Sequence, residues 1–309
     1  MLRSTLLRLS ESKTARNLAT KAPFASSMSH RFVAGDTIPE VVAATRRLNA
    51  AGMTATLDYL GESVHSRDEA RASADQYIAL LDAIAREKLD ANVSLKLTAM
   101  GQDIDLEFMH DNGERVIRRA AEHETFVRFD MEGSDYTQPT LDFFKRLWDE
   151  GLHNIGPVIQ AYLYRSADDV AWLTGLGTRV RLCKGAYKEP GAVAYPDKSD
   201  VDASYIRLMK TLLDEGTYPG IATHDPAMID ATIAYMKERG YGPDRFEFQM
   251  LYGVRRDLQR KIVEQGLRIR IYVPYGEAWY PYLMRRMAER PANLLFVAGN
   301  IVKEALPGR

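Results

Sequence analysis

The chain has 309 residues, 46% of them hydrophobic and 27% charged, with a formal net charge of −1. That size and composition allow a large buried core, and the balanced charge excludes an extended basic surface for nucleic acid. One cysteine, Cys183, excludes an internal disulfide framework, and no apolar run approaches the roughly 18 residues of a transmembrane helix.

The first 31 residues differ in composition from the rest. Six lysines or arginines stand there against a single acid, Glu11, among many Ser, Thr and Leu residues. This composition suits an organellar transit peptide, whereas Leu2, Leu6 and Leu9 recur at the spacing of an amphipathic helix. We predict a basic helical arm over residues 1–31, with a transit peptide as the alternative, and a single catalytic domain over residues 32–309.

Strand-like and helix-like runs alternate from residue 53 onward, after a helical segment at 32–52 that we expect to cover the bottom or side of the domain. The strand-like runs lie at 53–61, 92–98, 125–132, 156–164, 178–187, 219–226, 245–253 and 267–276. Helix-like runs at 66–89, 137–151, 201–216 and 227–240 lie between them, and several stop at a glycine.

Strands separated by helices predict parallel pairing through right-handed crossovers. Eight such units in about 240 residues match the size of a (βα)8 barrel of the α/β class, with a doubly wound open sheet as the alternative. The helix after the last strand, within "VPYGEAWYPYLMRRMAERPAN", is expected to lie over the barrel mouth. We expect its aromatic residues to pack beneath it rather than form a membrane-facing patch.

Nearly every strand-like run carries a polar residue near its end, where barrel enzymes place their catalytic groups. Burying a polar side chain inside a sheet that is covered on both faces costs free energy. Packing alone therefore does not explain why such residues recur near the ends of successive strand-like runs. They are Asp58, Lys96, Asp130, Gln160, Arg181 with Lys184, His224, Gln249 and Tyr272. We therefore predict an enzyme whose site lies at the barrel mouth.

Three of these positions have more than one interpretation. Asp58, followed by Gly61, is expected to bond loop amides at its strand end. Lys96, between two leucines, needs either a carboxylate neighbour or a chemical role, and Asp130 one strand along is the natural neighbour. His224 suits either a satisfied strand-end histidine or a ligand contact.

Two other motifs are discounted. The segment "GLGTRV" at 175–180 lacks the third glycine of a dinucleotide loop and falls between a helix and a strand. The segment "DIDLE" at 103–107 is expected to complement a helix N-terminus rather than bind a metal. The six histidines show no paired ligand spacing, so no metal site is predicted.

Seven motifs in order resemble those of the proline dehydrogenases, specifically the short monofunctional bacterial form. They are "SLKLT", "RFDME", "QAYLYRS", "RLCKGAYKEP", "ATHDP", "FEFQMLYGV" and "RIYVPYGEAWYPYLMRRMAERPAN", and the match spans about residues 32–306. The resemblance implies a barrel that holds FAD non-covalently and oxidises L-proline to 1-pyrroline-5-carboxylate, the first step of proline degradation to glutamate. It also implies that electrons pass to a membrane quinone.

The resemblance assigns roles to residues of this sequence. It makes Asp130 and Arg181 the catalytic residues, with Arg181 beside the reactive nitrogen of the flavin. The implied substrate contacts are Lys96, Tyr187, Leu251, Tyr272, Tyr282, Arg285 and Arg286. The implied flavin contacts are Met131, Gln160, Arg181, Lys184, Gly185, Ala186, Thr223, His224 and Gln249. The tyrosine at position 272 favours proline over hydroxyproline.

The residue types suit that chemistry. Arginine forks fix both the plane and the charge of a carboxylate, so Arg285 and Arg286 are expected to clamp the substrate, with Glu289 holding one of them. A cation near the flavin favours the anionic reduced state. Cys183 is expected to be a small buried hydrophobe, and the proton of the substrate amine is expected to pass to water.

The cellular location and the activity each have alternative interpretations. The protein is expected to be cytoplasmic and peripheral to the inner membrane, or mitochondrial if residues 1–31 are a transit peptide. A lysine Schiff-base aldolase that uses Lys96 or Lys184 on the same barrel, and a barrel that only binds a ligand, are the competing functions. The related methylenetetrahydrofolate reductases are also flavin barrels, but they would not require two arginines on the last helix.

Overall fold

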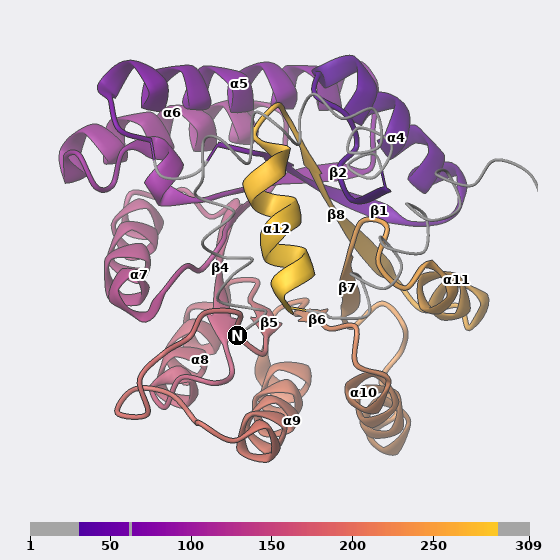
Figure 1. Ribbon diagram of the computed structural model, residues 1–309. Coiled ribbons are helices and arrows are strands. Elements are labelled where there is room, and N and C mark those ends of the chain that lie inside the picture. The colour runs from indigo at the N-terminus through magenta and orange to yellow at the C-terminus, as the bar shows by residue number, and fades with distance from the viewer. Residues whose placement is uncertain (1–30, 62–63, 290–309) are drawn as a thin grey trace, which may run out of the picture.

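The computed structural model describes residues 31–61 and 64–289, and these form a closed barrel of parallel strands (Figure 1). The strands follow one another around the barrel in chain order, and β8 pairs with β1 to close it. They are β1 (Thr54–Tyr59), β2 (Ala91–Leu95), β3 (Val127–Phe129), β4 (Ile155–Gln160), β5 (Arg181–Cys183), β6 (Gly220–Ala222), β7 (Glu247–Leu251) and β8 (Ile269–Tyr275). The predicted (βα)8 fold is confirmed.

Helices surround the barrel and cover the outer face of its strands (Figure 1). They are α4 (Ile38–Ala50), α5 (Arg67–Arg86), α6 (Leu106–Glu122), α7 (Ser134–Asp149), α8 (Ser166–Leu176), α9 (Lys198–Glu215), α10 (Pro226–Arg239) and α11 (Arg256–Glu264). A short 3-10 turn, η1 (Leu97–Met100), follows β2, and a last helix, α12 (Trp279–Glu289), follows β8. The predicted helix in residues 32–52 is α4, which packs on the side of the barrel against β1 and β8. Within the described ranges, no helix is long and apolar enough to cross a membrane.

Local chemistry explains where these elements begin and end. The carboxylate of Asp105 accepts a hydrogen bond of 2.8 Å from the backbone N–H of Phe108, so the acidic "DIDLE" segment caps α6 as predicted. The "GLGTRV" segment is the C-terminus of α8, where Gly177 adopts a left-handed conformation. The run predicted at 178–187 yields three strand residues, and Gly185, with a φ of 112°, follows closely after the strand end.

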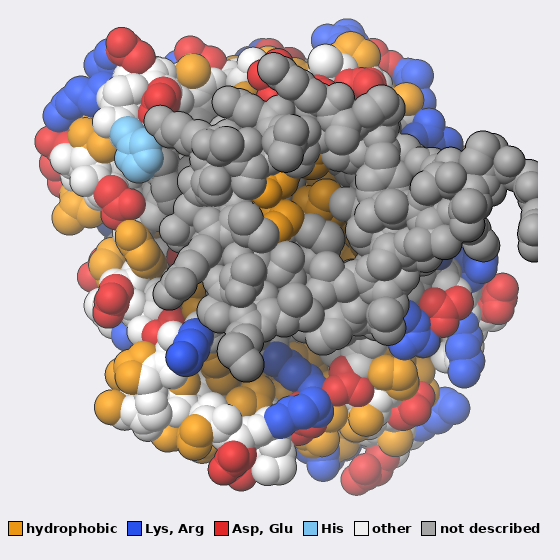
Figure 2. Space-filling model, in the orientation of Figure 1, with side chains coloured by type: hydrophobic (Ala, Val, Ile, Leu, Met, Phe, Trp, Pro, Cys, Tyr) orange, Lys and Arg blue, Asp and Glu red, His pale blue; other side chains and the backbone are white. Residues whose placement is uncertain are grey.

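Helix α12 lies across the barrel mouth, as expected (Figure 1). Its aromatic residues Trp279, Tyr280 and Tyr282 are buried in a small apolar cluster that includes Phe32 and Val254. The expected packing of this aromatic segment under the last helix is therefore confirmed. Figure 2 shows the same face, with lysine, arginine and carboxylate side chains spread around its periphery.

Some predictions fall outside what the structure describes. The proposed arm at residues 1–31 lies there except for its final residue. Arg285, Arg286 and Glu289 lie on α12, but their side chains are not among those described, so the predicted carboxylate clamp stays a prediction.

Candidate active site

A cavity of about 470 Å³ lies at the carboxyl ends of the strands, beneath α12. Such a volume is within the usual range for small-molecule sites. Every predicted site residue whose side chain is described lines it: Lys96, Asp130, Met131, Gln160, Arg181, Lys184, Gly185, Ala186, Tyr187, Thr223, His224, Gln249, Leu251, Tyr272 and Tyr282. The barrel thus gathers residues that are up to 186 positions apart in the chain, between Lys96 and Tyr282, around one space.

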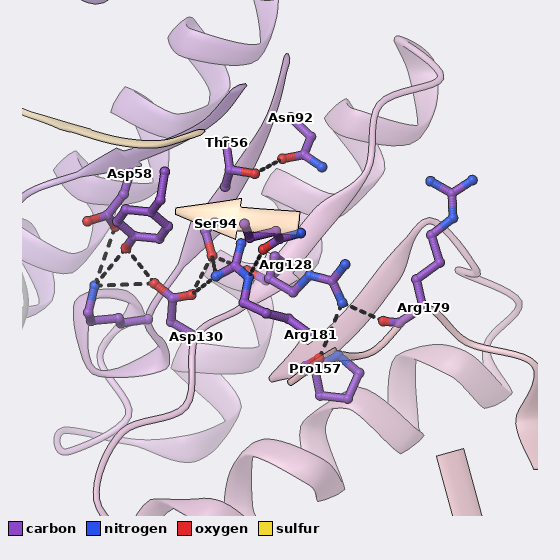
Figure 3. Close-up of polar contacts among 12 residues, drawn as sticks. Thr56, Asp58, Asn92, Ser94, Arg128, Asp130, Pro157, Arg179 and Arg181 are labelled. Atoms are coloured by element: carbon purple, nitrogen blue, oxygen red, sulfur yellow. Dashed lines mark hydrogen bonds and ion pairs between the residues drawn. The ribbon is translucent and has the colours of Figure 1, made fainter. Parts of the chain in front are cut away.

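Asp130 is the centre of a charged cluster at the floor of this cavity (Figure 3). Its carboxylate accepts hydrogen bonds from Ser94 Oγ at 2.6 Å, from Tyr272 OH at 2.6 Å and from Arg181 Nη1 at 2.7 Å. Burial acts to raise the pKa of this carboxyl, but Lys96, Arg181 and the hydrogen bonds outweigh it and hold the pKa below its ordinary value. Asp130 is therefore an anion at neutral pH.

Lys96 lies between two carboxylates. Its Nζ is 3.5 Å from Asp130 Oδ2 and 3.4 Å from both Asp58 Oδ1 and Tyr272 OH. The expected contact of Lys96 with Asp130 is present. Asp58, for which we expected only bonds to loop amides, is a second buried carboxylate of the cluster, because β1 and β2 are neighbours and their ends face the same space.

Two further members of the cluster were missed in the sequence. Ser94 on β2 lies two positions before Lys96, which directly follows that strand, so both side chains point to the same side, and this spacing could have identified it. Tyr77 comes from the outer helix α5, and its hydroxyl lies 2.9 Å from the carbonyl oxygen of Ser94 and 3.2 Å from Asp58 Oδ1. No pattern in the sequence signals that a helix side chain reaches the strand ends.

Tyr272 is a hydrogen-bond donor and not a base. Burial, followed by the Asp130 carboxylate, raises the pKa of its phenol well above the ordinary value. The guanidinium of Arg181 lies 5.4 Å from the centre of its ring. The phenol is therefore protonated, and its oxygen is fixed between Asp130 and Lys96.

The opposite rim of the cavity holds a second lysine between two aspartates. Lys184 Nζ donates to Asp202 Oδ1 and, at 2.7 Å, to Asp225 Oδ2. Lys198 joins the same group through Asp202. These pairs tie the loop after β5 to α9 and to the start of α10.

The loop after β5 makes the wall between these two ends. Gly185 is tightly constrained, since a Cβ there would approach the Tyr162 ring to 2.5 Å. The Tyr187 side chain is exposed. The hydroxyl of Thr223 accepts a 3.0 Å hydrogen bond from the backbone N–H of Asp225. His224 Nε2 accepts a 2.8 Å bond from the backbone N–H of Leu251, so this nitrogen carries no proton.

Cys183 lines the cavity but is chemically quiet. Burial raises the pKa of its thiol to about 12, so the reactive thiolate is absent at neutral pH. This agrees with its expected role as a small hydrophobe.

One cluster of potential metal ligands occurs in the described chain, away from the cavity. It comprises His110, Glu114 and Glu150 on α6 and at the end of α7. Both carboxylates are already paired with arginines, Glu114 with Arg118 and Glu150 with Arg146. His110 itself is buried, at 4% exposed, whereas the two carboxylates are partly exposed and held by these arginines.

The cavity suits a flat aromatic group with an anionic extension. Met131, Val158, Met250, Leu251 and Val254 give it an apolar lining near the charged floor, and Lys184 and Lys198 lie at its rim. Arg181 supplies a fixed cation between these parts. The donor set therefore fits a flavin nucleotide, although Lys184 must share its charge with two aspartates.

Sequence comparison identifies the family. The model of the family described as "Proline dehydrogenase" matches residues 41–299.

The chain belongs to the proline dehydrogenase family.

Among curated relatives, proline dehydrogenase 2 of Bacillus subtilis (strain 168) is 41% identical over 292 residues, which cover 94% of each chain. The proline dehydrogenase of Deinococcus radiodurans is 40% identical over 312 residues, covering 98% of each chain. The relationship to these proline dehydrogenases therefore extends over essentially their full length.

Solved structures share the fold. Proline utilization A (PutA) from Bdellovibrio bacteriovorus, in a form inactivated by N-propargylglycine, superposes with a TM-score of 0.79 at 30% identity. The match covers 85% of this chain and 32% of that protein, so this chain spans about a third of its length. The proline dehydrogenase barrel is thus common to a short chain and to much longer ones.

Proposed function

We propose that this member of the family oxidises L-proline to 1-pyrroline-5-carboxylate with FAD bound in the cavity. The observation that carries the proposal is the charged floor: a lysine, an arginine and a tyrosine arranged around Asp130, next to an apolar wall. When bound, the flavin supplies the hydride acceptor. The chain's own residues bind, orient and enclose the amino acid.

Substrate binding starts with the carboxylate of proline. Lys96 Nζ lies 3.4–3.5 Å from Asp58, Asp130 and Tyr272 at the cavity floor, where it supplies a cation for an incoming carboxylate. The sequence resemblance adds Arg285 and Arg286 from α12 as partners of the same carboxylate. The apolar side chain of Leu251 and the ring of Tyr272 are suited to contact the pyrrolidine ring.

The residues of the cavity floor provide fixed charges, but they do not act as bases toward the substrate amine. Asp130 is an ion-paired anion and Tyr272 is a protonated donor, so neither accepts the amine proton readily at neutral pH. His224 uses its unprotonated nitrogen for a backbone bond. We therefore propose that the amine proton leaves to water before hydride transfer, and that the cavity then positions the ring.

We propose further that the reduced enzyme passes its electrons to a membrane quinone and works at the inner membrane surface from the cytoplasmic side. This part rests on the sequence resemblance. Purified protein mixed with vesicles that contain a ubiquinone or menaquinone should consume proline without another acceptor. Equal turnover with a soluble dye, combined with no quinone reduction, would overturn it.

A flavin spectrum tests the central proposal. The purified protein should be yellow, and anaerobic addition of L-proline should bleach the flavin bands, whereas D-proline should not. A colourless protein that is inactivated by borohydride in the presence of a carbonyl substrate would indicate the aldolase alternative, with Lys96 or Lys184 as the amine.

A further inference from the structure

A second polar layer lies inside the barrel, one step below the cavity floor. Glu247 precedes Gln249 by two positions on β7, so both side chains point inward. Glu247 is 4% exposed, and its Oε1 accepts a 2.7 Å bond from Arg270 Nε on β8 and a 2.7 Å bond from Gln249 Nε2. Burial acts to raise the pKa of Glu247, but Arg270 outweighs it and the carboxyl is ionised.

The amide of Gln249 links this layer to the cavity. Its Oε1 accepts a 2.5 Å bond from Arg181 Nε, and Arg181 in turn bonds Asp130. A carboxylate only accepts hydrogen bonds and a guanidinium only donates them. An amide between Glu247 and Arg181 therefore has one satisfying orientation, with its nitrogen toward the acid and its oxygen toward the arginine.

A glycine on the neighbouring strand leaves the space that this amide occupies. Gly220 on β6 faces Gln249, and a Cβ at that position would lie 2.4 Å from Gln249 Nε2 and 2.8 Å from its Cδ. Any larger residue would thus displace the amide. Glu247 and Gly220 constrain Gln249 from two independent directions.

We propose that Glu247 is a positioning residue, which holds Arg181 at the cavity by fixing the orientation of the Gln249 amide. The inference rests on the proposed function for its catalytic consequence, because Arg181 then supplies the cation next to the flavin. Glu247 itself lines no part of the cavity and touches neither ligand.

Three variants separate this role from a purely structural one. Glu247→Gln removes the demand for one amide orientation. Gly220→Ala displaces the amide while leaving the ion pair between Glu247 and Arg270 intact, and its backbone does not require glycine. Arg270→Lys removes the guanidinium bond to Glu247 but keeps a cation beside it, so Glu247 stays an ionised acceptor for Gln249, and this variant is the matched control.

A simple charge effect and a displacement of Arg181 predict opposite changes in the reduction potential of the flavin. Loss of the negative charge in Glu247→Gln would by itself raise the potential, because the reduced anion would meet less repulsion. Displacement of Arg181 lowers the potential, because a cation withdraws from the flavin. We expect a lower potential in Glu247→Gln and in Gly220→Ala, and an unchanged potential in Arg270→Lys, where neither the amide nor the net charge changes.

Rates provide the second measurement. Flavin reduction by saturating proline should slow by about 10- to 100-fold in Glu247→Gln and Gly220→Ala, as is usual when a group that orients an active-site residue is lost, with a smaller change in Arg270→Lys. Equal losses in Glu247→Gln and Arg270→Lys, or a raised potential in Glu247→Gln, would overturn the inference.

A measurement that does not require flavin tests the positioning role of Glu247 separately from the proposed function. In protein labelled with 15N-arginine, the Arg181 Nε–H signal, assigned from an Arg181→Lys variant, should be protected from exchange in the wild type and exposed in Glu247→Gln. Unchanged protection would contradict the positioning role even if the protein bound no flavin. A wild type without flavin but with the expected exchange change would instead contradict the proposed function alone.

Discussion

The cavity has a lysine between two aspartates at each end, and the two groups differ in geometry. At the floor, Lys96 lies 3.4 and 3.5 Å from Asp58 and Asp130, and all three come from strands or strand ends of the barrel. At the rim, Lys184 makes tight pairs with Asp202 and Asp225, which belong to α9 and precede α10. The same residue types therefore occur in two settings: the floor group is built on strands of the barrel, and the rim group ties the loop after β5 to two helices.

The largest effect is expected from Asp130→Asn, which removes the central anion of the floor. Arg181 would lose the carboxylate it bonds and Lys96 one of its two carboxylates, and breaking a buried ion pair typically costs about 3–5 kcal/mol of stability. Urea titration at pH 7 measures this loss. Asp103→Asn, on an acidic segment outside the cavity, is the control and should change stability little.

The pH dependence of the stability difference between the wild type and Asp130→Asn tests whether the ion pairs cause it. The folded pKa of Asp130 lies below the ordinary value, so its contribution is complete above the unfolded carboxyl pKa of about 3.9 and is lost as the pH falls through the folded pKa. The stability gap between wild type and Asp130→Asn should therefore be constant from pH 7 to about 5 and narrow below about 4. A gap that closes already between pH 7 and 5 would show that the ion pairs are not its source.

Lys96→Met is expected to have the next largest effect, on catalysis. If Lys96 meets the substrate carboxylate, kcat/KM for proline should fall by about 30- to 1000-fold, equivalent to about 2–4 kcal/mol. Lys198→Met is the rim counterpart, since that side chain is 76% exposed, and with saturating flavin its kcat/KM should stay within about twofold of the wild type. Similar losses in both variants would remove the distinction between floor and rim.

Much of this arrangement could be predicted from the sequence, for identifiable reasons. The contact between Lys96 and Asp130 follows from two late polar residues on consecutive runs, because parallel strands bring their carboxyl ends together. Glu247 and Arg270 could have been found by the same argument, since each lies two positions before a predicted site residue. The partners of Lys184 could not, because they depend on how the loop after β5 turns.

Gly185→Ala should have an intermediate effect, on that loop. A Cβ would meet the Tyr162 ring at 2.5 Å, and the positive φ of 112° adds backbone strain, so a loss of about 1–3 kcal/mol is expected. The flavin dissociation constant should also rise. Gly191→Ala, in the same loop with open space around its Cα, is the matched control and should leave both quantities unchanged.

The smallest effect is expected from Asp225→Asn at the rim. Asparagine can still cap α10, as Asp225 does through its bond to the backbone N–H of Ala227, so only the charge is lost. Paired surface charges contribute little, and the free energy of unfolding should fall by less than about 1 kcal/mol, with the difference shrinking in high salt. A loss as large as that of Asp130→Asn would mean that rim and floor are energetically alike.

The docking of α12 has a consequence for the order in which the protein is made. Strand β8 must pair with β1, so the barrel closes only after residue 275 has left the ribosome, and α12 follows later still. The helix then seats against Phe32 and Val33, among the earliest described residues to be synthesised. A nascent chain that stops before residue 279 therefore holds every strand of the barrel while its cavity still stands open toward solvent.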